Sequence, residues 1–285
     1  MTTKPVYILT LSCVDKIGIV AAVSGFLAQH GCNILESAQY FDTGTGRFFL
    51  RTVFASEQGK ERAALLQAFQ AIREAFAMDA QLYDMRQPPK VLLLVSKFDH
   101  CLQELLYQQR AGSLKMAVTA VVSNHPDAKP LADFYRLPYY YFPMKNGDKA
   151  AQEARILEII EAEGVDLVVL ARYMQILSPE LCVKLQGKAI NIHHSFLPSF
   201  KGAKPYHQAH QRGVKIMGAT AHYVTSDLDE GPIIEQETTR ITHAHTPEEM
   251  IEMGRSLESL VLARAVKYHL EHRVVLNGAK TVVFR

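Results

Sequence analysis

The first 85 residues contain two kinds of hydrophobic spacing. Four short segments have the spacing of β-strands, two of them with alternating apolar and polar side chains, and two longer segments repeat apolar side chains at helical spacing. The expected strands are Val6–Leu11, Asn33–Phe41, Arg47–Ala55 and Ala80–Met85, and the expected helices are Ile17–His30 and Glu61–Phe76. This order, β-α-β-β-α-β, predicts a ferredoxin-like sandwich as the first domain.

A second pattern begins after two prolines. Pro88 and Pro89 force an extended connection, so residues 86–89 are expected to link a domain at residues 1–85 to one at residues 90–285. Continuous apolar runs then alternate with helical spacing, which is typical of an α/β domain whose mostly parallel sheet is covered on both faces. The expected strands are Val91–Val95, Ala117–Ser123, Tyr139–Phe142, Leu167–Leu170 and Ala189–His193, and the helices between them are Cys101–Arg110, Leu131–Arg136 and Lys149–Ala162.

The last forty residues predict one long helix and a hairpin. Thr246-Pro247-Glu248-Glu249 combines a capping box with proline at the first helical position, and the helix is expected to reach about Glu271. Two short apolar runs, 273–276 and 281–284, flank Asn277-Gly278, a favoured pair for a tight hairpin turn.

Composition excludes several classes of protein. The chain has 285 residues, 48% of them hydrophobic, and its formal net charge of +2 is too small and too evenly spread for nucleic-acid binding. Neither a membrane span nor a secretory signal is expected from the sequence. Four cysteines without paired spacing, at positions 13, 32, 101 and 182, are expected to be buried thiols, which favours the cytoplasm.

The end of the apolar strand 189–193 offers groups for catalysis. In open α/β sheets ligands bind at the carboxyl ends of the strands, where alternation places Asn191 and His193 on one side. Asp229 follows at a turn that Gly231-Pro232 completes. An amide, an imidazole and a carboxylate can stabilise an oxyanion and move protons while water attacks a carbonyl group. Taken singly, however, each such residue is more often a cap, a turn residue or a satisfied polar group.

Several spaced segments around these residues resemble the formyltransferase family that uses 10-formyltetrahydrofolate. They are 170–179 (Leu-Ala-Arg-Tyr-Met-Gln-Ile-Leu-Ser-Pro), 191–198 (Asn-Ile-His-His-Ser-Phe-Leu-Pro) with Lys-Gly at 201–202, 222–224 (His-Tyr-Val) and 227–234 (Asp-Leu-Asp-Glu-Gly-Pro-Ile-Ile). The resemblance, which covers roughly Lys90 to Glu271, implies that Asn191, His193 and Asp229 are the catalytic trio. It also implies a folate substrate without a permanently bound cofactor, and a pterin site formed by Met174, Ile176, Leu177, Ser226, Asp227 and Leu228.

One segment departs from that family. Members that formylate glycinamide ribonucleotide carry a glycine-rich loop after the first strand, which holds the substrate phosphate. Here residues 95–101 read Val-Ser-Lys-Phe-Asp-His-Cys, with no glycine and with a carboxylate at Asp99. A phosphorylated acceptor is therefore not expected, and water takes its place.

The chain thus resembles the branch of the family that hydrolyses 10-formyltetrahydrofolate to formate and tetrahydrofolate. Such a reaction supplies formate for purine synthesis and balances the one-carbon folate pool, and in it Asp229 would activate the water. Two rival functions stay open. One is transfer of the formyl group to an amine acceptor, and the other is an amino-acid-sensing regulatory protein whose second domain is inactive.

The first domain resembles the ACT domain, a small-molecule sensing module, through Asp15, Gly18 and the apolar helix that follows. Under the structural interpretation, which we favour, Asp15 caps the helix and Gly18 permits close packing. Under the functional interpretation the exposed helix N–H groups bind an amino-acid effector, with Asn33 nearby. The resemblance also implies a homo-oligomer.

The histidines do not predict a metal site. His193 and His194 are neighbours on a strand and are expected on opposite faces. His207 and His210 lie one helical turn apart, but no further ligand has a fitting spacing. Three basic side chains could meet the acidic glutamate tail of a folate, namely Lys201, Lys204 and His207. We favour the simpler interpretation that they are solvated surface residues.

Overall fold

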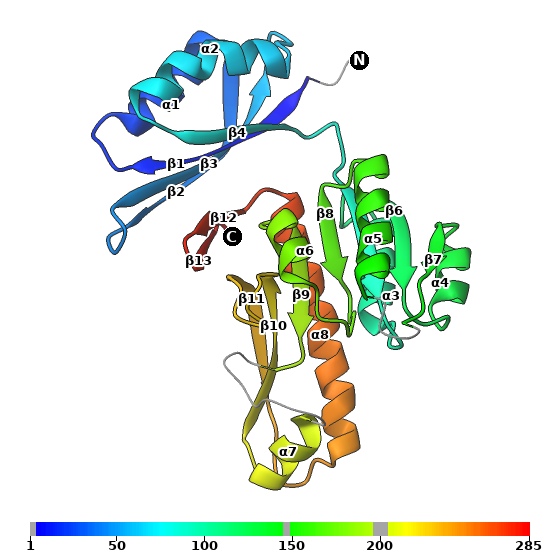
Figure 1. Cartoon of the computed structure of the whole chain (residues 1–285). Helices are drawn as coiled ribbons and strands as arrows, with labels where there is room; N and C mark the ends of the chain where they lie inside the picture. The colour runs from blue at the N-terminus through cyan, green and yellow to red at the C-terminus, as the bar shows by residue number, and fades with distance from the viewer. Residues whose placement is uncertain (1–3, 145–148, 196–204) are drawn as a thin grey trace. The chain divides into compact units, whose positions relative to one another are not determined.

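The computed structural model describes residues 4–144, 149–195 and 205–285 (Figure 1). Contacts divide the chain into two compact units. The first holds the residues up to Pro88 together with His272–Asn277 and Val282–Arg285, and the second holds Pro89–Glu271 and Gly278–Thr281. The division follows the expected linker, but most of the C-terminal hairpin belongs to the first unit rather than to the second domain.

The first unit has the predicted ferredoxin-like order. Its elements are β1 (Val6–Val14), α1 (Ile19–Gln29), β2 (Cys32–Asp42), β3 (Arg47–Ser56), α2 (Arg62–Ala75) and β4 (Asp79–Asp84). The antiparallel sheet has the order β2-β3-β1-β4. Both helices cover one face, because Leu27 of α1 and Phe69 of α2 join Leu50 of β3 in a single hydrophobic core.

The turn into α1 differs from the prediction. The helix starts at Ile19, and its N-cap is Gly18, where no side chain caps the helix. Asp15 is therefore not the cap, and its backbone N–H donates to Gly46 O at 3.1 Å. A Cβ at Gly18 would meet nothing within 4 Å, but φ there is +96°. Glycine thus serves the backbone conformation rather than close packing.

The second face of this sheet is covered by the C-terminal hairpin of β12 (Val274–Asn277) and β13 (Lys280–Val283). Phe49, which alternation places opposite Leu50, is fully buried against Val282 and Phe284. Asn277 Nδ2 donates to Asp42 Oδ2 at 2.6 Å. The hairpin completes the first unit because helices cover only one face of its sheet.

The second unit is the predicted α/β domain. Its elements are β5 (Lys90–Val95), α3 (His100–Arg110), β6 (Ala117–Ser123), α4 (Lys129–Phe134), β7 (Tyr139–Tyr141), α5 (Lys149–Glu163), β8 (Leu167–Leu170), α6 (Pro179–Lys184), β9 (Ala189–His193), α7 (Pro205–Arg212), β10 (Ile216–Tyr223), β11 (Ile233–Arg240) and α8 (Pro247–Leu270). The sheet order is β11-β10-β9-β8-β5-β6-β7. The five strands from β9 to β7 run parallel, and β10 and β11 add two antiparallel strands at one edge.

Helices on both faces bury the parallel strands. Leu92 and Leu94 of β5 pack against Ile156 of α5 and Leu181 of α6, whereas α3 and α8 pack together and α8 lies against β9, β10 and β11. The strand order reverses between β5 and β8, since β6 lies on one side of β5 and β8 on the other. The carboxyl ends of these two strands therefore form the crevice in which open α/β sheets bind their ligands.

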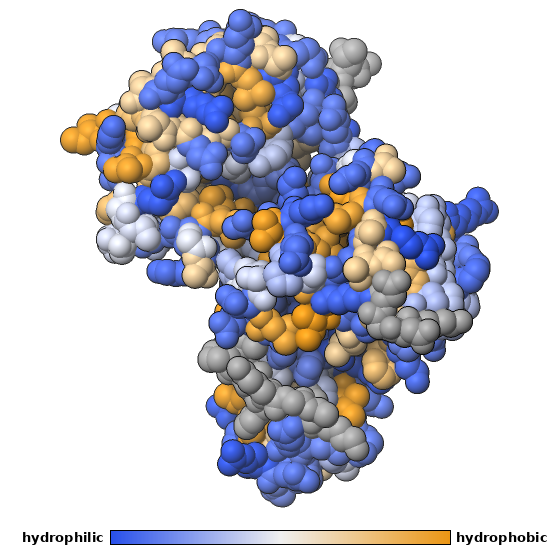
Figure 2. All heavy atoms as spheres, in the orientation of Figure 1, coloured by the Kyte–Doolittle hydropathy of each residue, from blue (hydrophilic) through white to orange (hydrophobic). Residues whose placement is uncertain are grey.

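The structure agrees with what the composition indicated about membrane spans and cysteines. On the face drawn in Figure 2, hydrophilic side chains predominate and apolar ones gather in separate groups. No helix in the described ranges has both the length and the apolar character needed to cross a membrane. All four cysteines are buried and unpaired, as predicted.

A buried histidine makes the stability of the protein depend on pH. Burial lowers the pKa of His269, on α8, from 6.5 to about 4, and the ring Nδ1 is hydrogen-bonded to the Tyr223 hydroxyl at 2.7 Å. Between pH 6.5 and pH 4 the unfolded chain binds a proton that the folded chain rejects, so this histidine lowers the free energy of unfolding as pH falls through that window.

We expect His269→Gln, which keeps an acceptor for Tyr223, to make the pH dependence of stability shallower. The slope between pH 4 and 6.5 should fall by up to about 1.4 kcal/mol per pH unit, the value for one proton. Urea unfolding of the full-length chain at several pH values measures this slope. The exposed His243 provides a matched control, His243→Gln. An unchanged slope in His269→Gln would contradict the assignment.

Candidate active site

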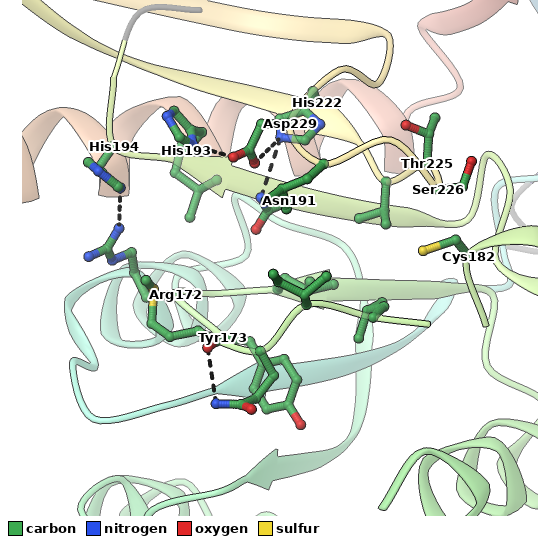
Figure 3. Close-up of a pocket in the computed structure, with 18 residues that line it drawn as sticks. Arg172, Tyr173, Cys182, Asn191, His193, His194, His222, Thr225, Ser226 and Asp229 are labelled. Carbon is green, nitrogen blue, oxygen red and sulfur yellow. Dashed lines mark hydrogen bonds and ion pairs between the residues drawn. The ribbon is translucent and has the colours of Figure 1, made fainter. Parts of the chain in front are cut away.

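A cavity lies at the carboxyl end of β9, as the sequence predicted (Figure 3). Asn191 and His193 alternate along the strand and both line it. The other walls come from the loop after β8 and from the end of β10 with the loop that follows it. All of the residues around the cavity belong to the second unit.

His222, which the sequence analysis did not select, completes the polar floor. Antiparallel pairing sets His222 of β10 directly opposite Asn191 of β9. Its Nδ1 lies 2.9 Å from Tyr223 O and must donate there, because a carbonyl oxygen only accepts. Its Nε2 lies 3.3 Å from Asn191 Nδ2. A signal for this residue was present in the sequence. His222 lies in the segment 222–224, near the end of a mostly apolar run, just as His193 lies at the end of the apolar strand 189–193.

Asp229 lies between the two imidazoles. Its Oδ2 is 3.2 Å from His193 Nδ1, and its Oδ1 is 3.6 Å from His222 Nε2. Hydrogen bonding to His193, and then to His222, holds the pKa of the Asp229 carboxyl far below its usual range. The side chain is consequently an anion throughout the physiological pH range, which suits it to orient an imidazole and makes it a weak base.

The loop that carries Asp229 depends on a close backbone approach. A Cβ on Gly231 would lie 1.7 Å from Tyr223 O, so no other residue fits without movement of the loop. Tyr223 N–H donates to Pro232 O at 2.9 Å and joins the two ends of the loop. Asp229 itself has φ of +59°, a backbone conformation that costs a non-glycine residue energy and often marks a functional site.

Apolar side chains form the rim of the cavity. Met174, Ile176 and Leu228 line it and are more than half exposed, and Leu177 lies deeper. Ser226 lines it as well, but Asp227 does not. The backbone carbonyl of Asp227 instead accepts the Thr225 hydroxyl at 3.0 Å, so this residue closes the turn.

His194 lies on the same side as His193, contrary to the prediction. The two rings stack with centroids 4.7 Å apart. Strand β9 ends at His193, so strict alternation no longer applies to the next residue. Arg172 Nη1 donates to His194 Nδ1 at 3.2 Å. Burial, then Arg172 and then His193 lower the pKa of His194 to about 4, which keeps this ring neutral.

The three predicted effector residues do not come together within one chain. Asp15 follows Val14 at one end of β1, whereas the register aligns Asn33 through Ala55 with Val6 at the other end. The two ends of this nine-residue strand lie roughly 25 Å apart at ~3.3 Å per residue. Closeness along the chain suggests that Asn33 lies near the turn into α1. Strand pairing instead places Asn33 at the far end of the sheet.

One group in the described part of the chain has metal-ligand geometry, namely His100, Cys101 and Glu258. Arg172 Nε lies 3.3 Å from the Glu258 carboxylate and already neutralises it. Burial raises the pKa of Cys101 far above its usual range, so the sulfur stays a thiol. We therefore interpret the group as an ion-pair cluster. Lys201 and Lys204 lie outside the described residues.

Comparison with known proteins agrees with this geometry. The formyl transferase family model matches residues 89–266, and the ACT domain model matches residues 7–74. Fold and site thus define a formyl transferase-type domain joined to an ACT domain.

Two known proteins are similar to this chain over almost its whole length. The formyltetrahydrofolate deformylase of Corynebacterium sp. (strain P-1) is 49% identical over 286 residues, which is 100% of both chains. The crystal structure of formyltetrahydrofolate deformylase from Burkholderia mallei is 52% identical and has a TM-score of 0.95, covering 99% of this chain and 100% of that one. The chain belongs to the formyltetrahydrofolate deformylase family.

A third structure is more distant. The glycinamide ribonucleotide transformylase 1 of Symbiobacterium toebii is 30% identical with a TM-score of 0.66, and the match covers 72% of this chain and 98% of that one.

Gly231→Ala should reduce activity because the added methyl group must push the loop, and Asp229 with it, away from His193. We expect a loss of roughly a hundredfold in turnover, the usual scale for a misplaced catalytic group. Formate release by the full-length protein measures it. The control is Gly25→Ala in α1, where a Cβ meets nothing within 4 Å. Full activity in Gly231→Ala would show that the close approach does not position Asp229.

Proposed function

We propose that the protein hydrolyses 10-formyltetrahydrofolate to formate and tetrahydrofolate, and that Asn191, His193 and Asp229 carry the reaction. The observation that supports these roles is the Asp229 carboxylate 3.2 Å from His193 Nδ1 beside the Asn191 amide, all at one cavity with an apolar rim. The protein is an enzyme of the deformylase family, and the relatives that match its whole length share that name.

In the proposed reaction, water attacks the formyl carbon and negative charge develops on the formyl oxygen. Asn191 is the donor for this oxygen once its N–H₂ group faces the cavity. Asp229 fixes His193 with Nδ1–H directed at its carboxylate, and in that tautomer Nε2 carries the lone pair that accepts the proton of water. We thus assign the base to His193 and the orienting role to Asp229, because a carboxylate with so low a pKa is a poor proton acceptor.

Collapse of the tetrahedral intermediate breaks the bond between the formyl carbon and the folate nitrogen. His193 Nε2–H returns the proton to that nitrogen, so formic acid leaves, loses its remaining proton to water as formate, and tetrahydrofolate remains. The apolar side chains of Met174, Ile176 and Leu228 provide walls against which a flat pterin can lie. The proposed roles use no bound cofactor, and the folate is the substrate.

The cell compartment and the metabolic role are also proposals. Four free, buried cysteines are typical of a reducing compartment, and we assign the protein to the cytoplasm. There the released formate would serve purine synthesis, and tetrahydrofolate would return to the one-carbon pool.

The decisive assay mixes the protein with 10-formyltetrahydrofolate and no amine, and measures formate. We expect the unaltered protein to release formate. In Asp229→Asn the rate of formate release should fall at least about a hundredfold, because the amide lacks the negative charge that holds His193 in place. Asp227→Asn removes a nearby carboxylate that does not line the cavity, and it should keep full activity. A formamide formed only after addition of an amine acceptor, without formate, would favour formyl transfer instead, and no product under either condition would favour a purely regulatory protein.

An amino-acid effector at the ACT domain remains a prediction. Since Asn33 lies at the far end of the sheet, we propose that an effector bound within one chain contacts the loop of Asp15 and Gly18 and not Asn33.

We further propose a homo-oligomer that forms through β2. This strand lies at the edge of its sheet and exposes four large apolar side chains, and an unpaired edge is a template for a second chain. The four are Ile34, Leu35, Tyr40 and Phe41.

Leu35→Lys, at the most exposed of these positions, should lower the mass measured by light scattering toward that of one chain, 31.9 kDa. A charge in a paired edge is costly to bury. Tyr107→Lys on α3, at a similarly exposed apolar residue of the other unit, serves as the control. An unaltered protein that already elutes at 31.9 kDa would reject the oligomer.

A further inference from the structure

Side chains of the protein itself meet one another at the crevice formed by the carboxyl ends of β5 and β8. Strand order reverses there, and in open α/β sheets this place receives a ligand. The loops that leave the two strands are joined, because Ser96 N–H donates to Arg172 O at 3.2 Å. The segment that begins at Ser96 is also the one that lacks the glycine-rich phosphate loop.

Glu258 of α8 is the centre of a buried polar cluster at this crevice. Only 1% of its surface is exposed, and three residues from three segments reach its carboxylate. His100 Nε2 lies 2.7 Å away, Arg172 Nε lies 3.3 Å away, and the Tyr206 hydroxyl donates at 3.0 Å. A buried carboxylate with this number of partners fixes the positions of all of them.

A glycine on α8 leaves the space that the Tyr206 side chain needs to reach this cluster. Gly254 lies one turn before Glu258 on α8, and a Cβ there would lie 2.1 Å from the Tyr206 hydroxyl. Replacement of that glycine would therefore force Tyr206 away from Glu258. The cluster requires specific residues on α7, on α8 and after both strands.

Arg172 connects the cluster to the cavity. Its guanidinium pairs with Glu258 and donates to His194, and Arg172 and His194 both line the cavity. Figure 3 shows these two side chains at one side of the pocket, with Ser226 and Cys182 at the other and Asn191 and His193 between. Arg172 has φ of +64°, a conformation that favours glycine, so a large cation is held there against backbone preference.

We propose that the Arg172–Glu258 pair determines acceptor specificity by closing the crevice from which an amine would reach the formyl carbon. This inference rests on the proposed hydrolase function and explains why water is the acceptor. Water is small enough to reach the carbon from the remaining cavity, whereas a larger amine needs the space that the pair fills.

Opening the crevice should allow a second reaction with the same folate. The nitrogen of an amine attacks the formyl carbon and a new carbon–nitrogen bond forms. The bond to the folate nitrogen then breaks, and the proton lost by the amine passes to that nitrogen. The products are a formamide and tetrahydrofolate, with no oxidant or reductant involved.

The test measures how the formyl group is partitioned between water and glycinamide. Full-length protein is mixed with 10-formyltetrahydrofolate and glycinamide, and formate and N-formylglycinamide are quantified by mass spectrometry. Because both products come from the same enzyme molecules, their ratio does not depend on the folded fraction or on the overall rate. A merely structural role of Arg172 would change the rate and leave the ratio constant.

In Arg172→Gly we expect the ratio of formylglycinamide to formate to rise by about tenfold or more over the unaltered protein, the scale on which pocket contacts discriminate substrates. Glycine suits the positive φ, so the backbone can stay in place. Glu258→Gln keeps the side-chain size but removes the charge that holds Arg172, and it should shift the ratio in the same direction. It serves as the second variant if Arg172→Gly does not fold.

The matched control is Arg155→Ala, which removes an arginine that packs on Phe142 outside the cavity. Its ratio should equal that of the unaltered protein. Equal ratios in Arg172→Gly, Glu258→Gln and the control, with formate release intact, would overturn the inference and leave the proposed function standing. No formate from the unaltered protein without amine would reject the proposed function, and this inference with it.

Discussion

The antiparallel pairing of β10 with β9 determines the geometry of the active site. It sets His222 opposite Asn191, and the loop that leaves β10 returns to bring Asp229 against both His193 and His222. The parallel strands behind β9 are covered by helices on both faces and provide a rigid support. A sheet that ended at β9 would present an amide and an imidazole without the carboxylate that lies against the imidazole.

The same pairing couples two functional groups through one nitrogen atom. His222 Nε2 lies near both the Asn191 amide and the Asp229 carboxylate, and it serves one partner at a time. Because Nδ1 of His222 donates to Tyr223 O, Nε2 is the ring nitrogen that faces both side chains. The proposed oxyanion donor Asn191 and the proposed orienting carboxylate of Asp229 therefore both lie against one imidazole.

Local patterns in the sequence were enough for the order of the first unit, for the parallel strands and for the place of Asn191 and His193 at the end of β9, whereas only the family resemblance joined Asp229 to them. Local patterns failed where the position of a residue depends on pairing between segments that lie far apart in the sequence. The edge strand β11 is polar, and its neighbour β10 was not recognised as a strand, so His222 was missed. Alternation could not place His194 beyond the end of β9. Only the β2–β3–β1 register reveals that Asn33 lies far from Asp15.

The C-terminal hairpin gives the chain an interleaved architecture. Chain order runs from the ACT unit through the catalytic unit and back, so Val282 and Phe284 complete a fold that began with β1. A cut at Pro88 would not yield two independent halves. The N-terminal fragment would expose Phe49 to water, and the C-terminal fragment would carry an apolar hairpin without its sheet. Domain-swap and fusion designs built on this chain therefore need to keep the last dozen or so residues with the ACT domain, although they are encoded after the formyl transferase-type domain.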